Sequence, residues 1–115
     1  MKLVRCYTRP ENLEKVRAML FEMGAPGLSV TEARGIGKPL SQMTTEAENA
    51  PRSIPQFRDR ICIEIVAEDG EAEEVALAVA ELCHTGAMGD GKIFILTVDD
   101  AIRIRTGERG PDSLY

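Results

Sequence analysis

The densest set of residues that could bind a ligand lies in segment 85–92, which reads Thr-Gly-Ala-Met-Gly-Asp-Gly-Lys. Its three glycines let the backbone approach a ligand closely and turn its N–H groups toward it. A nest of such N–H groups binds phosphate oxygens, and Lys92 adds a positive charge. The same residues also fit a plain turn from a helix to a strand, and the glycines and the lysine alone favour neither interpretation.

Segment 86–92 also matches the G-x-x-x-x-G-K half of a P-loop. However, Ile93 stands where a P-loop has the Ser or Thr that binds magnesium. The expected order is also reversed, because here a helix precedes the glycines and a strand follows them. The sequence therefore predicts phosphate binding without the chemistry of an NTPase.

Two arginines near the C-terminus form the second candidate. Arg103 and Arg105 alternate with isoleucines over 102–105, which predicts a short strand with both guanidinium groups on one face. Two parallel guanidinium groups suit a polyphosphate, since each offers a planar fork of donors. For the pair taken alone, a charged edge strand is the plainer explanation.

A third and weaker candidate is the group Gly35, Gly37 and Lys38, which follows another expected strand and could approach phosphate. No catalytic set is visible, because the single histidine, His84, has no evident nucleophile beside it and no acid to orient it. The adjacent Cys83 forms no recognisable metal site with it. The three cysteines lack CxxC spacing, which favours reduced thiols and a cytoplasmic location.

Composition narrows the classes of function further. The 115 residues suit a single domain, 1–115, and a net charge of −5 without a long basic run disfavours nucleic-acid binding. No apolar stretch approaches the ~20 residues that span a bilayer, so direct membrane insertion is not expected. The first residues also lack the apolar region of a signal peptide.

The apolar pattern predicts an α+β fold with five strands and two helices. Alternation indicates strands over 2–8, 28–34 and 61–66, and the apolar run 93–98 indicates a strand buried on both faces. Helical spacing indicates helices over 13–23 and 71–83, the first capped by Asn12 and ended by Gly24, the second preceded by a turn at Asp69-Gly70. With the short strand 102–105 added, the order is that of a ferredoxin-like βαββαβ sandwich.

A polar stretch from about 38 to 58 separates the second and third expected strands and contains Pro39, Pro51 and Pro55. A connection of roughly 20 residues inside a compact domain is usually functional or disordered. We predict a mobile interaction loop there, and a polar tail over 107–115.

Together these residues resemble the PII family of trimeric nitrogen and carbon signalling proteins over nearly the whole chain. The most specific part is 85–94, which ends in Lys-Ile-Phe, followed by 102–108, Ile-Arg-Ile-Arg-Thr-Gly-Glu. These two blocks look like the family's B-loop and C-loop signatures. Segments 30–37 and 63–66 add weaker support.

The resemblance implies a regulatory homotrimer with ATP or ADP, or AMP, in each of three clefts between subunits. It implies phosphate contacts from Gly89, Gly91, Lys92, Arg103 and Arg105, beside a loop that also holds Thr85, Gly86, Met88 and Asp90. It implies a ribose and adenine pocket formed by Gly27, Ser29, Glu64 and Val66, with Gly35, Gly37 and Lys38 nearby. The stretch 38–58 would be the T-loop, through which the nucleotide state reaches a partner, either a membrane transporter or a metabolic enzyme.

The expected T-loop departs from the family pattern at three points. It contains no tyrosine; Pro39 replaces the glutamine that helps bind magnesium and 2-oxoglutarate, with Gln42 the nearest substitute; and Arg60 stands where a lysine is usual. These departures leave open whether magnesium binds with the nucleotide. They also make bicarbonate an alternative to 2-oxoglutarate as the second ligand, with carbon metabolism as the alternative context. A slow ATP-hydrolysing enzyme is the alternative of another class, which phosphate release under excess ATP would reveal.

Overall fold

The computed structural model describes residues 1–37 and 56–115. Its helices and strands follow in the order β1 (Lys2–Thr8), α1 (Leu13–Glu22), β2 (Leu28–Gly35), β3 (Arg58–Ala67), α2 (Asp69–Cys83) and β4 (Lys92–Thr97). There are also two short 3-10 helices: η1 (Pro10–Asn12) directly precedes α1, and η3 (Gly110–Ser113) follows β4 near the C-terminus. Most of the expected T-loop, with Lys38, Pro39 and Gln42, lies outside the described residues.

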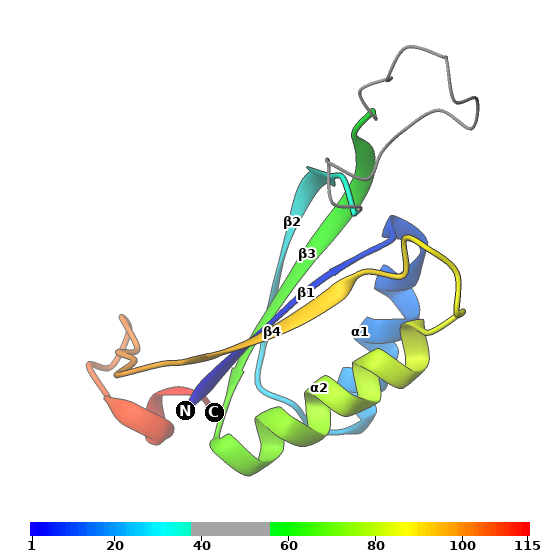
Figure 1. The fold of residues 1–115 in the computed structure, drawn as a ribbon. Helices are drawn as coiled ribbons and strands as arrows, with labels where there is room; N and C mark the ends of the chain where they lie inside the picture. The colour runs from blue at the N-terminus through cyan, green and yellow to red at the C-terminus, as the bar shows by residue number, and fades with distance from the viewer. Residues whose placement is uncertain (38–55) are drawn as a thin grey trace, which may run out of the picture.

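The four strands form one antiparallel sheet in the order β2-β3-β1-β4. Both helices lie on the same face of this sheet (Figure 1). The predicted ferredoxin-like βαββαβ arrangement is therefore confirmed. By register, Leu28 of β2 lies opposite Ile65 and Lys2 of β1 lies opposite Ala67, so the start of β2 is at the same end of the sheet as the N-terminus.

Period-two alternation in the central strands builds the core. Val4 and Cys6 of β1 lie beside Ile65 and Ile63 of β3, and all four are buried on the face that the helices cover. The helices contribute apolar side chains at helical spacing to the same layer: Val16 and Leu20 from α1, and Val75, Val79 and Cys83 from α2. All three cysteines are buried and free of disulfides, and burial raises the pKa of Cys6 to about 12.

The helix boundaries differ from prediction in two respects. Asp69 and Gly70 were expected to form a turn but occupy the first turn of α2. Asn12 precedes α1 as expected, yet its side chain does not cap the helix: its Nδ2 donates to Thr8 Oγ1 at 2.8 Å, in a buried position. Gly24, with φ of 66°, follows the end of α1 as predicted. No helix within 1–37 and 56–115 combines the length and apolar character needed to cross a bilayer.

On the other face of the sheet, no helix or strand among residues 1–37 and 56–115 forms a covering layer. Alternation places Tyr7, Phe94 and Leu96 on it, and the rings of Tyr7 and Phe94 meet edge to face with centroids 6.3 Å apart. The prediction that 93–98 is buried on both faces is wrong for the single chain, because β4 is an edge strand and Phe94 is 47% and Leu96 39% exposed. Exposed apolar patches of sufficient area are typical of interaction surfaces. We call this surface, defined by Tyr7, Phe94 and Leu96, the open sheet face.

The predicted strand over 102–105 does not form. Ile102 makes only an isolated bridge with Arg109, and the chain folds into a turn in which Gly107 N donates to Arg103 O at 2.7 Å. Gly107 has φ of +76°, a conformation that reverses the chain and that glycine adopts without strain. Ile104 is 99% exposed, so the alternating isoleucines have no sheet to pack against.

Candidate functional site

The turn between α2 and β4 has the backbone that the glycines predicted. Gly86, Gly89 and Gly91 have φ of 84°, 98° and 105°, all in the region that favours glycine. Gly91 is also required by packing, since a Cβ there would lie 1.8 Å from the carbonyl oxygen of Tyr7. This glycine therefore has a role inside the fold that is independent of any ligand.

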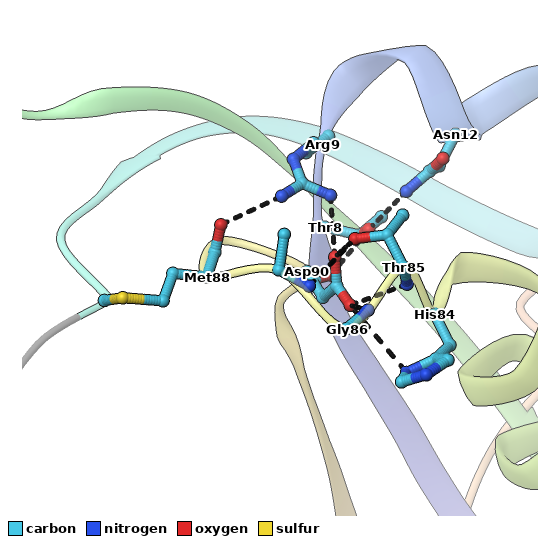
Figure 2. Close-up of polar contacts among 9 residues, drawn as sticks. Thr8, Arg9, Asn12, His84, Thr85, Gly86, Met88 and Asp90 are labelled. Atoms are coloured by element: carbon cyan, nitrogen blue, oxygen red, sulfur yellow. Dashed lines mark hydrogen bonds and ion pairs between the residues drawn. The ribbon is translucent and has the colours of Figure 1, made fainter.

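The carboxylate of Asp90 holds this turn together by hydrogen bonds to its first residues (Figure 2). Asp90 accepts the backbone N–H groups of Thr85 at 2.7 Å and Gly86 at 2.9 Å, the hydroxyl of Thr85, and Arg9 Nη1 at 2.8 Å. Arg9 Nη2 donates to the carbonyl of Met88 at 3.0 Å, which ties the middle of the turn to the end of β1. The side chains of Thr85 and Asp90, both expected near the ligand, are thus engaged within the protein.

These contacts hold the pKa of Asp90 well below its usual range, chiefly through the Thr85 hydroxyl, then the Thr85 N–H and Arg9. A lowered pKa in the folded state means that ionised Asp90 stabilises the fold fully above the unfolded value of ~3.9, and that this stabilisation is lost as the pH falls below it. The Asp90→Asn variant should therefore melt at a lower temperature than the wild type at pH 7. The difference between the two melting temperatures should become smaller as the pH falls from about 4 toward 2.

Thermal unfolding followed by circular dichroism across this pH range tests the prediction. Asp99→Asn is the matched control, because Asp99 is exposed and the substitution removes the same charge. A gap for Asp90→Asn that stays constant with pH would show that the ionised carboxylate is not what secures the turn.

A cleft of about 310 Å³ opens beside the turn, and five of the predicted site residues line it: Gly35, Gly37, Gly89, Gly91 and Lys92. Tyr7, Arg34 and Arg60 complete its polar and aromatic lining. We call it the glycine cleft. The arginines were not among the predicted ligand contacts, although the outward side of the β3 alternation, Arg60-x-Cys62-x-Glu64, is a signal that could have identified Arg60.

The glycine cleft is strongly cationic. Arg9 and Arg60 both extend to Gly89, where their Nη2 atoms would be 3.1 Å and 3.3 Å from a Cβ at that position. Arg34 and Lys92, the first residue of β4, add two further cations to the lining, whereas the charge of Arg9 is paired with Asp90. Convergent guanidinium groups beside a turn of positive-φ glycines suit an anion with several oxygens.

The residues expected to bind ribose and adenine meet in a second cleft, of about 380 Å³. Gly27, Ser29, Glu64 and Val66 line it together with Leu3, Pro26, Ser113 and Leu114. We call it the tail cleft, since its last two residues belong to the C-terminal tail. No motif in the sequence pointed to Ser113 or Leu114. Arg5 Nη2 lies 3.3 Å from Glu64 Oε2 beside this cleft and orients that carboxylate.

The two clefts lie toward opposite ends of β2. Ser29 is near the start of this strand and Gly35 is its last residue. Six residues of extended chain correspond to about 20 Å. One protomer therefore divides the predicted site into two halves.

The two predicted phosphate arginines do not share a strand face. Arg103 Nη1 contacts Glu108 Oε1 at 2.7 Å and its Nη2 donates to the carbonyl of Asp112 at 3.2 Å, while Arg105 lies in the exposed turn. Neither lines the glycine cleft or the tail cleft. The prediction of a common strand face is therefore wrong, because the alternating residues belong to a turn, while contact of the two arginines with phosphate stays a prediction.

The remaining predicted contacts fall near the glycine cleft or beyond the described part of the chain. Gly86 and Met88 belong to the turn without lining the cleft, and Met88 is exposed. Lys38 lies outside the described residues. Within 1–37 and 56–115, no three His, Cys, Asp or Glu side chains are grouped to hold a metal ion.

Comparison with known proteins shows similarity over essentially the whole chain. The family model described as "Nitrogen regulatory protein P-II" matches residues 1–108. Proteins of that name from Azospirillum brasilense and Rhodospirillum rubrum are 38% and 39% identical over 114 residues, which are 99% of this chain and all of each relative. Nitrogen regulatory protein GlnK2 of Haloferax mediterranei is 42% identical over 115 residues, 99% of this chain and 91% of its own.

Proposed function

Because the chain belongs to the nitrogen regulatory protein P-II family, and is thus a signal-transduction regulator and not an enzyme, we propose that it senses ATP and ADP. The observation that carries the proposal is the division of the predicted site into two complementary halves. The glycine cleft offers cations and backbone N–H groups suited to phosphates. The tail cleft offers the Ser29 hydroxyl and the Glu64 carboxylate for a ribose, beside apolar surface for a base.

Such a division supports assembly of several copies. If the glycine cleft of one protomer faces the tail cleft of the next, each contact completes one nucleotide site. An interface between two different surfaces of the same chain is heterologous, and it closes into a ring when the rotation permits. We propose a ring of three, as the resemblance to trimeric signalling proteins implies, with the open sheet face buried inside it.

The cations of the glycine cleft also bear on a second ligand. Arg34 and Arg60 line this cleft in addition to Lys92, so a small carboxylate or bicarbonate beside the phosphates is part of the proposal. The output is binding of a partner, a membrane transporter or a metabolic enzyme, in the cytoplasm. Calorimetric titration of the ADP- and ATP-loaded protein with 2-oxoglutarate and with bicarbonate distinguishes the two candidates.

The central test is removal of the Lys92 charge. Hydrogen bonds to charged groups contribute about 1.5–3 kcal/mol, so Lys92→Ala should raise the Kd for ADP roughly tenfold to a hundredfold, since ~1.4 kcal/mol is tenfold. AMP, with one phosphate, should lose less affinity than ADP. Isothermal titration calorimetry measures both values.

Lys15→Ala is the matched control, because Lys15 is exposed on α1 and lines neither cleft. The substitution removes the same charge as Lys92→Ala. Equal ADP affinity for wild type, Lys92→Ala and Lys15→Ala would place the phosphate site elsewhere. Failure of the wild-type protein to bind ADP or ATP would rule out adenylate sensing.

A further inference from the structure

The end of the chain forms part of the tail cleft. Ser113 and Leu114 line it together with Gly27, Ser29 and the other predicted ribose and base contacts. Resting on the function proposed above, we propose that the C-terminal segment 110–115 is a wall of the nucleotide site and determines how tightly the adenosine part is held. The match to the family model ends at residue 108, before this segment begins, while the relatives from Azospirillum brasilense and Rhodospirillum rubrum align over 99% of the chain.

Hydrogen bonds fix the segment at both of its ends. Gly110 N donates to the carbonyl of Ala101 at 3.0 Å, and Arg103 Nη2 donates to the carbonyl of Asp112 at 3.2 Å. At the other end, the hydroxyl of Tyr115 donates to Glu71 in the first turn of α2. A segment held at both ends can position a side chain between them, so Leu114 has a defined place in the cleft.

The tail lines the cleft without filling it. With Ser113 and Leu114 in place, the cleft retains about 380 Å³, which is within the roughly 300–1,000 Å³ typical of small-molecule sites. A segment that occupied the ligand's position would leave less space. The tail is therefore a wall that contacts the ligand, and its loss should weaken binding.

The chemistry of this wall is apolar. The hydroxyl of Ser113 already donates to the carbonyl of Gly110 at 2.6 Å, so Leu114 is the part of the tail that remains to contact a ligand. Leu3 and Val66 add apolar surface to the same cleft. A flat base packed between such side chains gains affinity in proportion to the buried apolar area and independently of the phosphates.

The geometry also gives Arg103 a role other than the predicted phosphate contact. Its guanidinium holds the carboxylate of Glu108 and the carbonyl of Asp112, and so connects the turn at 104–106 to the tail. Arg103 is then a positioning residue for the wall. Its replacement should affect adenosine as much as ADP, whereas loss of a phosphate contact would spare adenosine.

Calorimetry with adenosine, AMP and ADP tests the proposal on the full-length chain. Leu114→Ala should raise the Kd for all three ligands by the same factor, about three- to tenfold, because the lost contact is to the part they share. Leu77→Ala is the matched control, since Leu77 is 63% exposed on α2 and outside the cleft. Lys92→Ala, in contrast, should cause a loss that grows with the number of phosphates.

Removal of residues 113–115 should also raise the Kd for all three ligands equally, by a larger factor than Leu114→Ala. Tyr115→Phe, which loses only the hydroxyl that donates to Glu71, should raise the three Kd values by a smaller factor. Unchanged or tighter binding by Leu114→Ala would refute the proposal that the tail contacts the ligand. Tighter binding would show in addition that the tail competes with the ligand. A loss confined to ADP would also overturn the proposal, because the tail would then act on the phosphates. If wild type binds none of the three ligands, the proposed function itself fails; if wild type binds and Leu114→Ala binds equally well, only this inference fails.

Discussion

Gly91→Ala is expected to cost about 3–4 kcal/mol of folding free energy, close to the upper end of single-residue effects. The added Cβ would lie 1.8 Å from the carbonyl oxygen of Tyr7 and 3.1 Å from the Cα of Thr8, and both atoms belong to the backbone of β1. Neither atom can move without disturbing β1, which pairs with both β3 and β4. The φ of +105° adds strain for any residue with a side chain.

Urea unfolding of the Gly91→Ala variant measures the loss. Gly70→Ala is the control, because a Cβ at Gly70 meets nothing within 4 Å and the residue lies in the first turn of α2. This control should be neutral or stabilised by up to ~1 kcal/mol, since alanine is the better helix former. Equal stability of the two variants would mean that the α2–β4 turn can separate from β1 at little cost.

Phe94→Glu is expected to convert the proposed trimer into monomers at micromolar concentration. Phe94 lies in the open sheet face, where its ring contacts Tyr7, and assembly would bury it. Burying a carboxylate without a partner costs several kcal/mol, and one such charge per subunit places three in a ring of three. The molar mass from light scattering should therefore fall about threefold.

Phe21→Glu makes the same substitution on the helix side, where Phe21 is 82% exposed on α1. That variant should keep the mass of the wild type. A trimer that survives Phe94→Glu would place the interface away from the open sheet face, and a monomeric wild type would refute the assembly.

Most of the fold was predictable because its signals are local. The alternation in 2–8 and 61–66 and the helical stripe in 71–83 each identify one element and the face that it buries. The run 93–98 shows the limit of this reasoning. An apolar strand in a core and an apolar edge strand with an exposed face have the same composition. Only the sheet order therefore revealed that β4 is an edge strand.

The site was less predictable because its contacts join distant parts of the chain. Arg9 and Asp90 are 81 residues apart, and neither the proline after Arg9 nor the glycines around Asp90 indicate that they form an ion pair. The isoleucines flanking Arg103 suggested a strand because alternation alone cannot show whether a neighbouring strand is present to pair with it. Ser113 and Leu114 carry no motif, and only the return of the tail toward β2 and β3 gives them a place in a cleft.

The positions of the two tyrosines have a practical consequence for spectroscopy. The chain has only two tyrosines and no tryptophan, and Tyr7 lines the glycine cleft while Tyr115 ends the segment that walls the tail cleft. The thiol of Cys62 raises the pKa of Tyr7, and the hydrogen bond to Glu71 raises the pKa of Tyr115 to about 12, so both phenols stay protonated at neutral pH. Isotopic labelling of tyrosine rings alone therefore yields one magnetic-resonance signal for each half of the divided site. Occupancy of the proposed phosphate half and of the proposed base half can then be followed separately in the same sample, without mutation or an attached dye.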